Sequence, residues 1–244
     1  AASVANIDVS PLIRAMAERD RALISLQTSA VMEFRNGTQH LKAREELAVR
    51  RPDCLRVEAM SPLGVALVVA ARDAHLQIFE PSRNTLMQGT ADAATLARFA
   101  RIPMAPRDAV GLLMGIVPEA QSTAPPDSIG SEGDMTVLAY VESDGARREV
   151  GLHDGQVEMV RKRMPAGAID FEIHYADYRD IGGVMFAYKV SADFPLAATQ
   201  VSFVYQRPII NGKIPDSTFV LSPGPSAKLV DIGMLFFRQD LIDG

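Results

Sequence analysis

Residues 51–71 read Arg-Pro-Asp-Cys-Leu-Arg-Val-Glu-Ala-Met-Ser-Pro-Leu-Gly-Val-Ala-Leu-Val-Val-Ala-Ala, and they predict a strand, a tight turn and a second strand. Apolar side chains alternate with polar or larger ones over 55–60, which is typical of a strand with one apolar face. The Ser-Pro-Leu-Gly sequence at 61–64 favours a tight turn, because proline presets φ and glycine accepts a positive φ. Leu63 is therefore expected at the tip of a turn, where an apolar side chain calls for a functional explanation.

Short strand patterns continue on both sides of this stretch, from residue 26 to residue 90 and again from residue 135. Turn residues separate them, which predicts an antiparallel sheet of about ten or eleven strands. The alternation is interrupted at 44–46, where we expect a bulge. We expect a surface loop over 121–134 and a further strand over 218–221.

Three segments have helical periodicity instead. Ser10 and Pro11 predict the start of an amphipathic helix that ends near residue 25, with its polar face formed by Arg14, Glu18, Arg19 and Arg21. Thr90 is the expected cap of a second helix over 91–100. A third begins at 105–106 and ends before Gly115.

A long antiparallel sheet tends to curl, and three helices are too few to fill it. We therefore expect a mainly β (α+β) fold: an incomplete antiparallel barrel with a lid of about three helices over an apolar cavity, which would suit acyl chains. The candidate lining residues are the apolar ones on the expected inner strand face and helix stripes: Leu55, Val57, Leu96, Phe99, Leu112 and Leu113. The eleven methionines either fill the core or give such a cavity a deformable lining.

Composition and motifs narrow the functional classes. The net charge of −5 and the lack of a basic run argue against nucleic acid as a partner. The longest apolar run, 65–71, is far too short for a membrane-spanning helix. The single cysteine, Cys54, lies in a strand pattern and is expected to be a small half-buried side chain. The four histidines are scattered without metal-ligand spacing, and there is no nucleophile elbow or phosphate loop. We therefore expect a non-enzymatic protein without cofactor or metal.

Four segments, in order, resemble the LolA/LolB superfamily of periplasmic lipoprotein carriers, and LolB most closely. Residues 55–64 resemble the LolB segment that ends in Pro-Leu-Gly. Residues 99–104 and 113–118 are similar to its helix pair, with its Ile-Pro step and closing Leu-Gly-x-Pro. Residues 171–178 resemble its later Val-x-Tyr-x-x-Tyr strand. The likeness covers most of residues 10–205.

The resemblance implies a half-barrel that shields lipoprotein acyl chains and, for LolB, delivers them to the inner leaflet of the outer membrane from a LolA-like periplasmic donor. Leu63 matches the protruding leucine of LolB that takes part in membrane delivery, and Arg51 matches the LolA arginine that ties the lid to the barrel. We expect one lipid-binding domain over 1–244, with a loose arm over 1–9. Residues 208–244 form an extension beyond LolB's end, and 214–223 are more like the LolA C-terminus.

The resemblance also implies a location at the periplasmic face of the outer membrane. LolB is anchored there by an acylated N-terminal cysteine, so we expect that a signal segment and that cysteine precede this chain. The alternative is an envelope-stress sensor or protein-interaction module on the same fold, as in RseB.

Overall fold

The computed structural model describes residues 8–37, 39–117 and 124–233. Fourteen strands form its framework: β1 (Ser25–Asn36), β2 (Gln39–Arg50), β3 (Cys54–Ser61), β4 (Gly64–Arg72), β5 (His75–Glu80), β6 (Thr85–Thr90), β7 (Ser128–Glu132), β8 (Met135–Val141), β9 (Arg147–His153), β10 (Gln156–Arg163), β11 (Ile169–Ile181), β12 (Val184–Phe194), β13 (Thr199–Ile210) and β14 (Lys228–Asp231).

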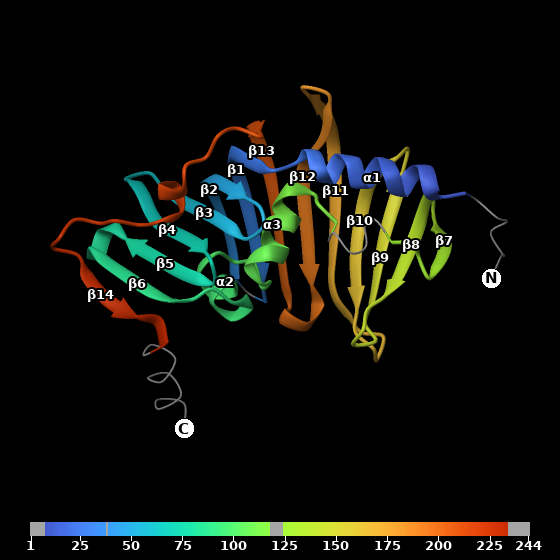
Figure 1. The fold of residues 1–244 in the computed structure, drawn as a ribbon. Coiled ribbons are helices and arrows are strands. Elements are labelled where there is room, and N and C mark those ends of the chain that lie inside the picture. The colour runs from blue at the N-terminus through green and yellow to red at the C-terminus, as the bar shows by residue number, and fades with distance from the viewer. Residues whose placement is uncertain (1–7, 38, 118–123, 234–244) are drawn as a thin grey trace. The chain divides into compact units, whose positions relative to one another are not determined.

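These strands make one open sheet in the order β14-β6-β5-β4-β3-β2-β1-β13-β12-β11-β10-β9-β8-β7, which does not close on itself (Figure 1). The expected mainly β, incomplete barrel with three helices is thereby confirmed. The sheet has fourteen strands rather than the ten or eleven expected, and one of them, β7, forms within the segment predicted as a loop. Strand β14 departs from antiparallel pairing, since it pairs parallel with β6. The expected arm over 1–9 lies mostly outside the described residues.

The helices are α1 (Ser10–Ala22), α2 (Ala93–Phe99) and α3 (Pro106–Met114), with short 3-10 helices η1 (Pro81–Arg83), η2 (Pro195–Ala197) and η3 (Asp216–Phe219). Proline stands in the first turn of α1, as predicted, but the capping residue is Val9 rather than Ser10. Asp92, not Thr90, caps α2, since its side chain accepts the backbone N–H of Thr95 at 2.8 Å. No helix in the described part of the chain is long and apolar enough to cross a membrane.

The chain divides into two compact units. Unit 1 comprises residues 1–24, 33–41 and 111–204, and unit 2 comprises residues 25–32, 42–110 and 205–244. Unit 1 therefore holds α1 and β7–β12, while unit 2 holds β3–β6, α2, η3 and β14. Strands β1, β2 and β13 and helix α3 contribute residues to both.

In unit 2 the segment before β14 covers one face of the sheet. Phe219 and Ile214 pack on Ala48 and Cys54 in a buried cluster. Leu221 packs on a second cluster of β4 and β6 residues, Val68, Ala70 and Leu86. The strand expected over 218–221 is therefore wrong: η3 occupies its first part, because its side chains are buried against the sheet face rather than paired at an edge.

Charged contacts hold the same segment in unit 2. The guanidinium of Arg50 donates to the carboxylate of Asp216 at 2.6 Å and to the carbonyl oxygen of Ile214 at 2.9 Å. The hydrogen bond from Arg50 to Asp216, with the charges of Arg72 and Arg50, holds the pKa of Asp216 below its usual value.

Burial raises the pKa of the Cys54 thiol. Cys54 is buried further than expected, and a buried thiol with a raised pKa is a weak nucleophile.

In unit 1 the two sheet faces have different characters. On one face, Arg161 of β10 forms ion pairs with glutamates of three other strands. It pairs with Glu132 of β7 at 2.9 Å, with Glu149 of β9 at 3.0 Å and with Glu172 of β11. The opposite face carries Tyr175, whose ring lies 3.6 Å from the position a side chain would take at Gly115, just after α3. We call this second face, which meets the end of α3, the lid face of unit 1.

Candidate functional site

The turn between β3 and β4 displays Leu63 as predicted. Its relative exposure is 101%, the highest of the exposed large apolar side chains in the described residues. The hydroxyl of Ser61 accepts the backbone N–H of Leu63 at 3.2 Å and donates to the carbonyl oxygen of Gly64 at 3.0 Å. Gly64 has φ 112°, a conformation that favours glycine. The turn therefore holds the leucine outward, and its role at a membrane stays a prediction.

The predicted lining residues are nearly all removed from water. Leu55 and Val57 are buried on β3, Leu96 is buried on α2, and Phe99 at the end of α2 is half-buried. These four belong to unit 2, whereas Leu112 and Leu113, buried on α3, belong to unit 1. Burial agrees with an inner position for each side chain. That they line a lipid cavity stays a prediction.

Arg51, the predicted lid tether, lies in the turn between β2 and β3 and is half-buried. Its neighbour Arg50, which the sequence did not single out, binds the segment before β14 instead. The role of Arg51 as a tether stays a prediction.

An unpredicted pair, Arg19 and Asp20 of α1, holds the chain just after α3. The guanidinium of Arg19 donates to the carbonyl oxygen of Gly115 and pairs with the carboxylate of Asp20 at 2.8 Å. The other oxygen of Asp20 accepts the backbone N–H of Val117 at 3.0 Å. We call this set of contacts the Arg19–Asp20 latch.

The latch is removed from solvent, so the expected place of Arg19 on the polar face of α1 is wrong. Its side chain is only 12% exposed and that of Asp20 only 5%. Burial acts to lower the pKa of Arg19, but the charge of Asp20 and the contacts with Tyr178 outweigh it and raise the pKa. The helical periodicity could not predict this buried pair, because a charged residue beside the apolar stripe of a helix is expected to be exposed to solvent.

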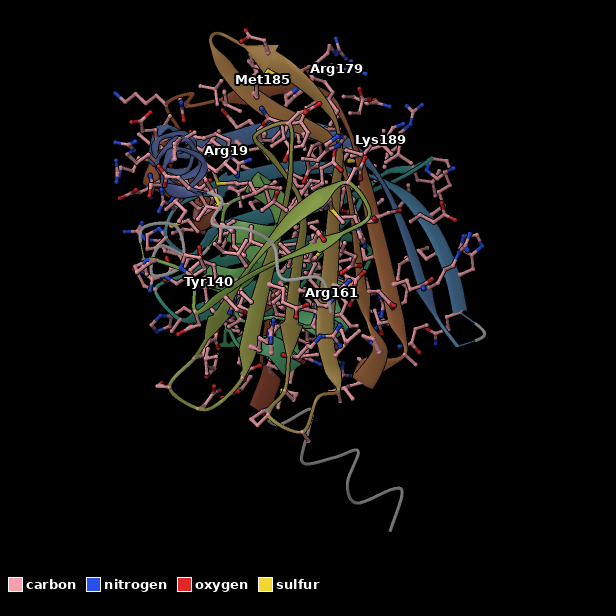
Figure 2. The ribbon with its side chains drawn as sticks, turned by 90° about the vertical axis from the view of Figure 1, so that its right-hand side faces the viewer. Arg19, Tyr140, Arg161, Arg179, Met185 and Lys189 are labelled. Carbon is pink, nitrogen blue, oxygen red and sulfur yellow. The ribbon has the colours of Figure 1, made fainter. Side chains whose placement is uncertain are left out.

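A groove of about 350 Å³ lies beside the latch. It is bounded by α1 and by the turns after β9 and β11, and Met16, Arg19, Val157 and Met185 contribute to its wall. Figure 1 shows α1 running across one end of these unit 1 strands, and Figure 2 places Arg19 and Met185 at that end. Methionine side chains adapt to irregular apolar shapes, and Met16 and Met185 give this part of the wall that adaptability.

Glu45 on β2 is a buried acid without a hydrogen bond to any described residue. It lies opposite Ala59 in a pairing of β2 with β3 that has no register shift, so the bulge expected at 44–46 is absent from this pairing. Glu45 instead takes an inward position on the face that carries Leu47 and Val57. Burial raises the pKa of Glu45 to about 8.

Comparison with known proteins identifies the fold. No family model matches the sequence, and no curated protein matches it either. Three solved structures are similar over most of the chain. A DUF1329 family protein from Desulfovibrio piger is 9% identical with a TM-score of 0.61, over 88% of this chain and 98% of that one. A LolA superfamily protein from Nitrosomonas europaea is 10% identical with a TM-score of 0.57, over 88% and 99%.

The third is a domain from Vibrio parahaemolyticus named provisionally as an outer membrane lipoprotein-sorting protein. It is 10% identical with a TM-score of 0.58, over 85% of this chain and 95% of that one. Identities this low establish likeness of fold and leave function to be argued from the site. The chain therefore has the fold that LolA-superfamily and DUF1329 proteins share.

Proposed function

We propose that this protein is a non-enzymatic carrier that shields the acyl chains of lipoproteins or other lipids and delivers them to the outer membrane, as LolB does. The observation that carries the proposal is the fully exposed Leu63 at the tip of a hydrogen-bonded turn. The fold supports it, because it is similar to that of a LolA superfamily protein. A leucine held in water contributes nothing to stability, whereas burial in a bilayer is worth about 1.5–3 kcal/mol.

In this proposal the acyl chains lie against the apolar residues on the inner strand face and on α2 and α3. Arg51 and the Arg19–Asp20 latch limit the movement of the lid helices, and Leu63 makes the first contact with the acceptor bilayer. Insertion of a single leucine biases docking without anchoring the protein. The location that follows is the periplasmic face of the outer membrane, with a LolA-like protein as donor.

The test is binding and transfer of a fluorescent fatty-acid analogue. We expect saturable binding that an unlabelled fatty acid displaces, followed by transfer of the analogue to liposomes of phosphatidylethanolamine and phosphatidylglycerol. Failure to bind any acyl probe, with the fold intact by circular dichroism, would overturn the carrier proposal. A defined protein partner found by pull-down, together with no acyl binding, would favour the RseB-like sensor instead.

A further inference from the structure

The lid face of unit 1 carries a cluster of polar side chains near one end of strands β8–β11. Tyr140, Arg148, Lys162 and Phe171 occupy directly opposite positions on these four strands, one from each. Directly opposite residues of neighbouring strands share a face and lie within side-chain contact. Phe171 lies four residues before Tyr175 on β11 and is therefore on the same strand face, which places the cluster on the lid face.

The hydroxyl of Tyr140 has no hydrogen-bond partner in the described part of the chain, and the residue is only 4% exposed. Burial raises its pKa to about 12, so the phenol keeps its proton and remains a donor. An unpaired buried hydroxyl costs stability, and native proteins rarely leave one without a reason. The missing partner is therefore an acceptor.

The charges beside Tyr140 do not balance. The carboxylate of Glu142 accepts the Nε–H of Arg148 at 2.8 Å and pairs with Nζ of Lys162 at 3.2 Å. Although burial acts to raise the pKa of Glu142, these two cations lower it, so Glu142 is ionised. One negative charge thus faces two positive charges, and the described residues provide no second acid for them.

The donors are also arranged for an anion. Arg148 is only 8% exposed, and its guanidinium lies 5.7 Å from the centre of the Phe171 ring, within the range of a cation–π contact. Its bond to Glu142 uses Nε, and the terminal nitrogens make no hydrogen bond or ion pair with any described residue. A guanidinium fork, an ammonium and a phenol are the donors that bind phosphate and carboxylate groups.

We infer that Tyr140, Arg148 and Lys162 bind the single anionic group, phosphate or carboxylate, of an amphiphile whose acyl chain lies along the lid face. This inference rests on the proposed carrier function and names the class of ligand. The site lies at the opposite strand ends from the latch: Figure 2 shows Tyr140 toward one end of the unit 1 strands and Arg19 toward the other. The headgroup would thus be bound away from α1, and the acyl chain would lie along the strands between them.

The experiment compares dodecyl phosphate, dodecanoate, dodecanol and inorganic phosphate by calorimetry, in the wild type and in two variants. Tyr140→Phe removes only the unpaired hydroxyl, and Lys162→Gln removes one cation. Lys189→Gln, on the solvent-exposed part of β12, is the matched control for charge loss. We expect at least one anionic amphiphile to bind the wild type about tenfold more tightly than dodecanol. Each site variant should lose most of that advantage, while dodecanol binding and the control should stay unchanged.

The outcomes separate the two proposals. Equal affinity for dodecanol and both anionic amphiphiles, insensitive to Tyr140→Phe and Lys162→Gln, overturns the anion site and leaves the carrier proposal standing. No binding of any dodecyl compound overturns the carrier proposal itself. Inorganic phosphate that binds as tightly as dodecyl phosphate, with the same sensitivity to both variants, overturns the amphiphile and assigns the site to free phosphate.

Discussion

The carboxylate of Asp20 accepts a hydrogen bond from the backbone N–H of Val117 at 3.0 Å, and so joins the first helix of the chain to the segment after the third. Arg19 completes the link through the carbonyl oxygen of Gly115. Carbonyl groups at the end of a helix have no partner within the helix, and here α1 supplies a donor to the carbonyl just after α3 and an acceptor to the N–H of Val117. The end of α3 is therefore fixed by a charged pair that is itself buried.

Loss of Arg19 is expected to destabilise unit 1. Arg19→Gln would leave the buried carboxylate of Asp20 without its counter-charge, and breaking a buried ion pair from one side costs about 3–5 kcal/mol. Urea unfolding followed by circular dichroism measures the change in the free energy of unfolding. Arg14→Gln, an exposed arginine on the same helix, is the matched control and should change it by less than about 0.5 kcal/mol. Equal effects of the two variants would contradict a latch.

Leu63→Glu should slow lipid transfer while leaving the fold and lipid loading intact. The substitution removes the gain from bilayer burial and adds a charge near hydrocarbon, but an exposed turn should tolerate it with under about 0.5 kcal/mol of lost stability. Rates of transfer of a loaded fluorescent lipid to liposomes measure the effect. Leu196→Glu replaces another exposed leucine, 65% exposed in η2, and should leave the rate unchanged. Undiminished transfer by Leu63→Glu would show that Leu63 has no role in delivery. Loss of folding in this variant would show that Leu63 instead packs against the rest of the protein.

Arg51→Leu tests the predicted lid tether. If Arg51 restrains the lid as the LolA arginine does, the variant should change the off-rate of a bound fatty-acid analogue without changing the fold. Stopped-flow dilution into excess unlabelled ligand gives the off-rate. Arg83→Leu, in the exposed 3-10 turn η1, is the control for loss of a positive charge. Off-rates that match the wild type would return Arg51 to a structural role in its turn.

Because Glu45 is buried, we expect the free energy of unfolding to fall as pH rises. Its pKa is about 8 in the folded protein against an ordinary value of 4.5, so between these two values the folded state binds a proton that the unfolded state has released. The free energy of unfolding should therefore decrease by up to about 1.4 kcal/mol per pH unit from pH 4.5 to pH 8, and level off above.

Denaturant unfolding at several pH values of the wild type and of Glu45→Gln measures this dependence. The glutamine variant keeps the shape of the protonated acid but does not titrate, so its stability should vary less over the same range. Glu46→Gln, on the opposite face of β2 where the carboxylate accepts from the Ser29 hydroxyl at 2.8 Å, is the matched control. Parallel pH profiles for the wild type and Glu45→Gln would contradict a buried titrating acid.

The alternation of side chains along residues 55–60 was enough to predict a strand, and Pro62 and Gly64 were enough to place Leu63 at an exposed turn. Both depend on interactions between residues close in sequence, namely the strand period and the φ preferences of proline and glycine. The same local rules located all three helices and most strands. They also predicted a sheet larger than its helices could fill.

The tertiary structure decided what depends on distant partners. Residues 218–221 have a strand-like composition, yet η3 forms there because Phe219 and Leu221 are buried against two sheet clusters. From the sequence, Arg19 is expected to be exposed to solvent, but the position of α1 lets its guanidinium donate to the carbonyl oxygen of Gly115. Tyr140, Arg148 and Lys162 come together only through the register of three strands. Register and helix docking are set by the total apolar area buried across the whole sheet, which no local pattern of residues records.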